Sequence, residues 1–243
     1  MQICYFSHDS TAKGKWGDSL IECELSLLKR AMQDNNDYYH FMSGNDYLLV
    51  SEEKFKDFFN KNNGKEFIGF SRKGFADQER QRYQVYHFLQ EKVGRNKTGI
   101  YWIEKVLVKL QMSSCIVDRT KEFNNIKYEV GSEWCSLTKN FVGYLLGKEQ
   151  VIKKMFKWGF CCDEVFVQTI FINSPFKNNN YQRAFSNYGE NIQNVRAIDW
   201  KRGRPYTYEY SDYKELIESK NIFVCKVNND TLEREKLLDL LDE

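Results

Sequence analysis

The segment 160–174, FCCDEVFVQTIFINS, places two cysteines and two acids directly before a mostly apolar run. Thiolates and carboxylates can ligate a metal ion, and a carboxylate in a cleft can act as a general base. Zinc sites normally use spaced pairs of ligands, whereas Cys161 and Cys162 are adjacent and have no second pair nearby. The three histidines are His8, His40 and His87, which are also widely spaced. The spacing therefore argues against a metal site.

An acid/base interpretation of the same segment depends on helical spacing. If residues 163–172 form a helix, Glu164 and Gln168 lie on one face of an otherwise apolar element. A polar stripe of this kind can line a cleft, where Glu164 could take a proton from a substrate. Alternatively, Asp163 and Glu164 simply occupy a first helical turn, where acids interact favourably with the helix dipole. Spacing alone leaves both interpretations open.

The common phosphate-binding and nucleophile motifs are absent from the chain. It contains no G-x-S-x-G, no G-x-G-x-x-G and no Walker sequence. It also lacks the D-x-D pair with which many sugar transferases hold Mn²⁺ on a nucleotide diphosphate. If this chain handles a nucleotide, its own side chains must neutralise the phosphates. Each candidate charge also has an ordinary structural interpretation. Asp46 is typical of a turn, Arg196 of a surface ion pair, and Lys226 of the solvated end of a strand.

The composition indicates a folded chain without a bulk charge signal. The 243 residues carry 36 basic and 34 acidic side chains, a net charge of +2, which argues against nucleic-acid binding through overall charge. No apolar run approaches the length of about 20 residues that a membrane helix needs, and the N-terminus does not resemble a signal peptide. Seven scattered cysteines favour reduced thiols and a cytoplasmic location. We expect one domain over residues 1–243.

Helices and short strands are predicted to alternate along this chain, which is typical of an α/β fold. The helices are expected at 19–33, from Ser51 to about 60, across much of 78–112, before Gly147, at 211–219 and from about Asp230. The strands are expected at 2–6, 38–42, 66–70, 195–200 and 221–227, with 163–172 either helix or strand. Ligands of such sheets bind beyond the C-terminal ends of strands. The turns at 43–46 and 131–133 are therefore the places to look for a site.

The order of six segments resembles the core-2/I-branching β-1,6-N-acetylglucosaminyltransferase family, which is related to the peptide O-xylosyltransferases. The resemblance covers roughly residues 14–62 and 126–228 and is closest to bacterial members. The segments are WGDSLIECELSLLKRA, DYYHFMSGNDYLLVS, GSEWCSLTKNFVGYLL, CDEVFVQTIFINS, VRAIDW and SDYKELIESKNIFVCKV. The resemblance implies a GT-A-like domain with a mixed, mostly parallel sheet flanked by helices. It also implies an inverting transfer from a UDP-sugar without a metal ion or other cofactor.

The resemblance assigns roles to particular residues. Glu164 corresponds to the catalytic base, and Arg196 and Lys226 correspond to the two cations that neutralise the departing diphosphate. The expected borders of the cleft are Trp16, Asp46, Ser132, Glu133, Trp134 and Trp200. The two cysteines before Glu164 are then expected to serve packing. Trp134 and Trp200 could stack on sugars or belong to the core.

One departure from the family bears on the expected activity. Family members begin with a strand–helix–strand unit that carries much of the nucleotide pocket, and this chain is expected to lack it. The expected function is sugar transfer to a glycan or glycolipid acceptor in surface polysaccharide or glycoconjugate synthesis. The protein is expected to be cytoplasmic, to have no nucleic-acid partner and to be able to bind peripherally at the inner membrane surface. The alternatives are a non-catalytic carbohydrate- or partner-binding relative without a complete nucleotide pocket, and an unrelated hydrolase using Asp163 and Glu164.

Overall fold

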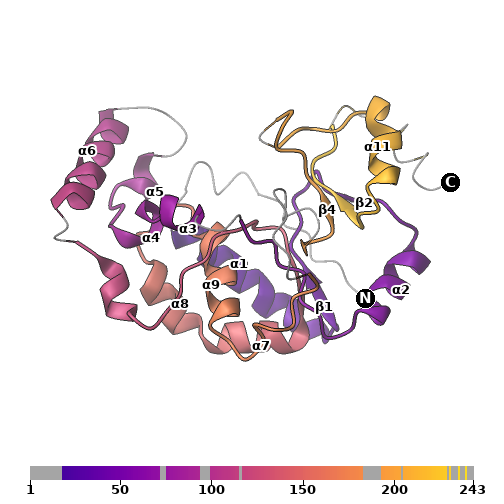
Figure 1. The fold of residues 1–243 in the computed structure, drawn as a ribbon, viewed down its shortest axis with the longest axis horizontal. Helices are drawn as coiled ribbons and strands as arrows, with labels where there is room; N and C mark the ends of the chain where they lie inside the picture. The colour runs from indigo at the N-terminus through magenta and orange to yellow at the C-terminus, as the bar shows by residue number, and fades with distance from the viewer. Residues whose placement is uncertain are drawn as a thin grey trace.

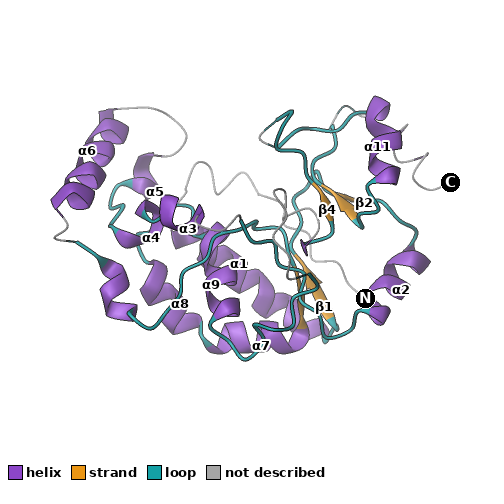
Figure 2. Cartoon of the chain, in the orientation of Figure 1, coloured by secondary structure: helices purple, strands orange, loops and turns teal. Residues whose placement is uncertain are grey.

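The computed structural model describes residues 18–71, 75–93, 99–114, 117–182, 193–203 and 205–228, together with residues 230, 235 and 239. Helices alternate with short strands along these ranges, as Figures 1 and 2 show, which confirms the α/β class. The expected strand 2–6 and Trp16 lie outside the described residues, as does most of the helix expected from Asp230. None of the described helices combines the length and apolar character that a membrane span requires.

The α-helices form where capping signals and apolar periodicity coincide. Ser51 accepts a hydrogen bond from the Lys54 amide at 3.4 Å and so caps the helix Glu52–Lys61, as the sequence predicts. The helix Glu149–Phe156 was not expected. The α-helices with described bounds are α1 (Asp18–Ala31), α2 (Glu52–Lys61), α3 (Phe75–Gln78), α4 (Gln81–Gln84), α5 (Gln90–Val93), α6 (Gly99–Ser114), α7 (Lys139–Gly147), α8 (Glu149–Phe156), α9 (Asp163–Ile172) and α11 (Tyr213–Glu218). The described residues also form three short 3-10 helices: η2 (Met32–Asp34), η3 (Arg119–Phe123) and η4 (Tyr210–Asp212).

The strands within the described ranges form two small sheets. In one, β1 (Tyr38–His40) pairs antiparallel with β3 (Ser136–Thr138). In the other, the order is β2 (Tyr47–Leu48), β5 (Phe223–Val224), β4 (Arg196–Ala197), with β2 antiparallel and β4 parallel to β5. The mixed orientation agrees with the expectation, but two of these three strand pairs are antiparallel, so the pairing is less parallel than expected. A parallel sheet requires a regular crossover connection between successive strands. Strands of two or three residues that are joined by long connections can instead pair in either direction.

The largest core cluster lies among α1, α7, α8 and α9. It includes Ile21 and Leu25 of α1, Phe141 of α7 and Phe166 of α9. Eight of the ten residues of α9 are buried, so nearly every face of this mostly apolar helix is covered by other parts of the protein. This is why its sequence fits a helix and a buried strand equally well. In the structure this segment is a helix, and its first turn contains Asp163 and Glu164.

Candidate active site

Glu164 lies in the first turn of α9 and keeps 34% of its side chain exposed. Its Oε2 accepts a hydrogen bond from an Nη1–H of Arg82, which follows the first residue of α4. Arg82 is largely buried, and its Nε donates to Glu79 Oε2 at 2.6 Å. Burial lowers the pKa of Arg82, but the charge of Glu164 and the hydrogen bonds to both carboxylates outweigh burial and raise that pKa overall. The guanidinium therefore holds Glu164 in one orientation with a permanent positive charge.

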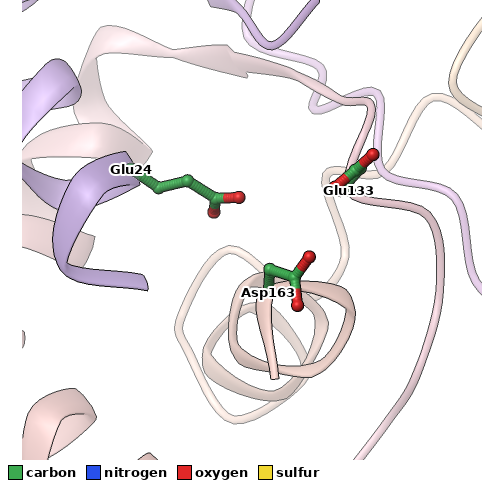
Figure 3. A group of neighbouring side chains, drawn as sticks. All are labelled: Glu24, Glu133 and Asp163. Carbon is green, nitrogen blue, oxygen red and sulfur yellow. The ribbon is translucent and has the colours of Figure 1, made fainter. Parts of the chain in front are cut away.

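A group of three carboxylates stands beside Glu164. Figure 3 shows Glu24 reaching from α1, Asp163 from α9 and Glu133 from the loop before β3 into a shared space. One ligand oxygen from each lies within 4.8 Å of the others. Asp163 is buried and shares a hydrogen bond with Glu133, while its Oδ1 has no partner among the described residues. Asp163 thus occupies the expected first turn of α9 and also belongs to this group.

Protons or a cation must relieve the repulsion within this group. Burial, followed by the charge of Glu164, raises the pKa of Asp163 to about 6. Burial and then the charge of Asp163 raise the pKa of Glu24 and of Glu133 well above the usual range. Such shifts favour protonated forms within the group, and the hydrogen bond between Asp163 and Glu133 requires a proton between these two carboxylates. The three carboxylates could also ligate a divalent cation, so the expected absence of a metal stays a prediction.

The segment from Gly131 to Trp134 joins α9 to the sheet. The Gly131 amide donates to the Glu164 carbonyl at 2.9 Å, and the buried Gln168 donates from Nε2 to the Ser132 carbonyl at 2.7 Å. Gln168 is fully buried, and its side-chain amide holds the backbone at Ser132 against α9. The polar stripe of Glu164 and Gln168 that could line a cleft is therefore not formed. Ser132 is buried as well, and its Oγ accepts from the Trp134 amide at 3.2 Å. These contacts place Glu133 beside Asp163.

Arg196 opens β4 and lies in the core, with 1% exposure. Its guanidinium donates to the carbonyls of Asn194, Phe41 and Cys135 at 2.5, 3.2 and 2.9 Å. The guanidinium carbon lies 4.5 Å from the centre of the Phe223 ring. Burial lowers the pKa of Arg196 to about 10. The surface ion pair considered from the sequence is wrong, because this side chain ties the backbone around β1, β3 and β4 together. The expected contact with a diphosphate stays a prediction.

Lys226 follows β5 and is partly exposed. No described carboxylate forms an ion pair with its ammonium group, but its charge opposes the rise in the pKa of Glu133. In the parallel pair, Arg196 lies opposite Phe223, three residues before Lys226. Arg196 thus lies on β4 and Lys226 shortly after the neighbouring β5, and their expected contact with a diphosphate stays a prediction.

Asp46 and two tryptophans complete the surroundings. Asp46 is a buried turn former, because it accepts hydrogen bonds from the Ser43 amide and hydroxyl at 2.6 and 2.7 Å. Its carboxylate also accepts a hydrogen bond from the thiol of Cys225, which directly precedes Lys226. Trp134 is buried, Trp200 is exposed, and their ring centres lie 6.5 Å apart. The structure thus places the segment that carries Glu133 against the first turn of α9, next to Glu164, whereas Arg196 lies in the core and Lys226 follows β5. The roles expected of these residues stay predictions.

Two residues of this arrangement were not expected from the sequence. Arg82 belongs to the region that matches the family only loosely, and Glu24 lies on a helix with an ordinary polar face. An arginine set between acids in a charged stretch is a weak signal. The cysteines behave as expected: Cys161 and Cys162 are both buried, and Cys162 belongs to the main core cluster.

Comparisons with known proteins identify the family. Residues 7–220 match the Core-2/I-Branching enzyme family. A curated protein of Drosophila melanogaster, named Xylosyltransferase oxt, is 24% identical over 248 residues. The aligned region covers 93% of this chain but 26% of that protein. The chain thus spans about a quarter of the length of the curated relative that it matches.

Proposed function

The chain belongs to the Core-2/I-branching enzyme family, and we propose that it is a glycosyltransferase that moves a sugar from a UDP-sugar to a hydroxyl group of a glycan acceptor. The proposal includes N-acetylglucosamine or a related sugar, an inverting reaction without a metal ion, and a role in bacterial surface polysaccharide or glycoconjugate synthesis. Family membership supports the reaction class, as does the relative whose name calls it a xylosyltransferase.

The position of Glu164 is the observation that carries this proposal. Its carboxylate is accessible to an acceptor, because about a third of the side chain is exposed (34%), while Arg82 fixes its orientation. A general base must reach the proton that it removes, and a fixed carboxylate loses little entropy in doing so. The neighbouring Asp163 is buried and hydrogen-bonded to Glu133, so it is less suited to meet an acceptor.

In the proposed reaction, Glu164 accepts the proton of the acceptor hydroxyl while the hydroxyl oxygen forms a bond to C1 of the donor sugar. The bond between C1 and the diphosphate oxygen breaks on the opposite face, and UDP departs with the electron pair. The configuration at C1 is thereby inverted. Lys226 supplies positive charge to the departing diphosphate, and the buried Arg196 adds positive potential from the adjacent strand.

A non-catalytic carbohydrate- or partner-binding protein is the second candidate. The burial of Arg196 favours it, because a guanidinium that donates to three backbone carbonyls has few hydrogen atoms left for a phosphate. The two candidates make different predictions about turnover, since a binding protein would hold UDP or a glycan without releasing UDP from a UDP-sugar.

The test is the release of UDP from UDP-N-acetylglucosamine and UDP-xylose in the presence of a panel of glycan acceptors and EDTA. We expect turnover to persist in EDTA and to fall about 100-fold or more in Glu164→Gln, because the general base is lost. UDP binding should be retained in Glu164→Gln and weakened in Lys226→Ala.

Glu79→Gln is the matched control. It also removes a carboxylate partner of Arg82 but leaves the carboxylate of Glu164 in place. Its turnover should stay within a few-fold of wild type. Full turnover in Glu164→Gln would remove the general base from the proposal, and turnover abolished by EDTA would remove the metal-free mechanism and point to the three carboxylates of Figure 3. Absence of turnover with every donor would favour the binding protein.

A further inference from the structure

The helix α6 presents an apolar face to solvent. Figure 1 shows it at one extremity of the molecule, and it packs against α5. Its buried residues are Glu104 and Val108. On the opposite side are its most exposed apolar side chains: Trp102 (62%), Ile103 (56%), Val106 (57%) and Leu110 (59%). Their spacing places all four on one face of the helix. A contiguous apolar face of this kind marks an interaction site.

The exposed charges of α6 are positive. Lys105 and Lys109 are exposed and lie four residues apart, next to the apolar face. The single acid of the helix, Glu104, is buried, accepts a hydrogen bond from the Leu89 amide at 3.2 Å and lies 3.5 Å from His87. The solvent side of α6 therefore combines apolar side chains with two cations and no anion.

Further exposed aromatic rings border α6. On its inner side, Gln111 exchanges hydrogen bonds with the backbone of Tyr86 at 3.0 and 2.9 Å. The Tyr86 ring stacks on Phe88, whose ring centre lies 4.8 Å from that of Trp158. Phe88 and Trp158 are both exposed, and Lys157 lies over the Trp158 ring. The surface beside α6 repeats the combination of aromatic rings with lysine.

This chemistry fits an anionic lipid surface better than a second copy of the chain. A helix of 16 residues is about 24 Å long, so one face of it covers far less than the roughly 800 Å² per partner that a stable dimer buries. Lysine is depleted at protein interfaces, whereas helices that lie in a membrane surface pair an apolar face and tryptophan with lysines that meet anionic headgroups.

We propose that α6 is an interfacial anchor that docks this protein on a membrane containing anionic lipid. Trp102, Ile103, Val106 and Leu110 enter the boundary between headgroups and acyl chains. Lys105 and Lys109 contact lipid phosphates. This assignment does not depend on the chemistry at Glu164, so the two can fail separately.

The test is flotation of the full chain with vesicles of phosphatidylcholine alone or of phosphatidylcholine mixed with phosphatidylglycerol. We expect binding to the mixed vesicles that weakens at high salt. The double substitution Val106→Asp with Leu110→Asp should reduce binding about tenfold or more, because it removes apolar insertion. Reversal of both charges, Lys105→Glu with Lys109→Glu, should reduce binding to the mixed vesicles by a similar factor, so that the preference for anionic vesicles is lost.

Ile217→Asp is the matched control, since Ile217 is an exposed apolar residue of α11. Its binding should stay within about twofold of wild type. Circular dichroism and the unfolding midpoint establish that each variant is folded; if the aspartate pair does not fold, the charge reversal at two exposed lysines carries the test. Equal flotation of all variants, or no flotation of wild type, overturns the proposal. A wild-type dimer that Val106→Asp dissociates, without vesicle binding, would also overturn it and assign the face to a second copy.

Discussion

Asp163 and Glu164 are neighbours in sequence but have different surroundings at the scale of single residues. Glu164 is partly exposed and paired with Arg82. Asp163 is buried beside Glu24 and Glu133, and burial together with the charge of Glu164 raises its pKa to about 6. Environment, and not residue type, separates two carboxylates into a candidate base and a proton-sharing acid. The same surroundings make Arg82 the residue whose substitution is most informative.

We predict that Arg82→Ala lowers kcat/KM for the acceptor about 10- to 100-fold, because Glu164 loses the group that orients it. Arg82→Lys should restore part of the rate, because it keeps a positive charge beside Glu164. Steady-state kinetics measure both effects, and the unfolding midpoint of each variant checks that it is folded. An equal loss of rate in Arg82→Ala and Arg82→Lys would contradict orientation by the positive charge.

The segment from Gly131 to Trp134 is the element that holds the acidic group against the sheet. It forms an isolated antiparallel bridge between Gly131 and Phe70, and the Gly131 amide donates to the first turn of α9. A Cβ at Gly131 would lie 1.9 Å from the Gly69 carbonyl oxygen and 2.9 Å from Gln168 Nε2. The approach of two backbone segments therefore requires glycine here, and the position of Glu133 depends on it.

We predict that Gly131→Ala destabilises the protein by about 1–3 kcal/mol or more and lowers turnover, because the clash is with backbone and cannot be relieved by a rotamer change. Gly143→Ala is the matched control: Gly143 is exposed on α7, and a Cβ there meets no atom within 4 Å. It should be neutral or stabilise by about 0.5–1 kcal/mol through helix propensity. Urea unfolding measures both. Equal stability of the two variants would contradict the tight contact at Gly131.

At the scale of the whole molecule, the sequence predicts elements well where local chemistry defines them. Ser51 caps α2, Gly147 ends α7, and Asp46 closes the turn before β2, as expected from their residue types. The apolar α9 was ambiguous because a helix buried on all sides loses its periodicity. These successes and failures share one cause: only interactions between near neighbours leave a pattern in the sequence.

The site depends on partners that are distant in the chain. Arg82 and Glu164 are separated by 82 residues, and Arg196 reaches the Phe41 carbonyl across 155 residues. Motif order identifies Glu164, Arg196 and Lys226 as candidates, but it contains no information about burial. The sequence therefore could not reveal that Arg196 ties core backbone together, or that Glu24 joins Asp163 and Glu133.

Buried acids should also control how the stability of the whole molecule depends on pH. Folding raises the pKa of Asp163 from 3.8 to about 6, so the folded state favours its protonated form. Its contribution to stability is complete below about pH 4 and is lost as the pH rises through 6. Asp163→Asn should therefore match wild type near pH 4 and exceed it by about 1–3 kcal/mol at pH 7. The charged groups that face it are Glu24, Arg82, Glu133 and Glu164.

Asp199→Asn provides a control of opposite sign for this pH series. Burial raises the pKa of Asp199, but hydrogen bonds from Arg202 and from the amides of Lys201 and Arg202 outweigh burial and lower it below its usual value. Its contribution is present at neutral pH and is lost as the pH falls through the folded-state pKa, so this variant should be less stable than wild type at pH 7 and approach it in acid. Urea unfolding across the series measures both slopes. A stability difference for Asp163→Asn that does not grow between pH 4 and 7 would show that the three carboxylates do not share a buried proton.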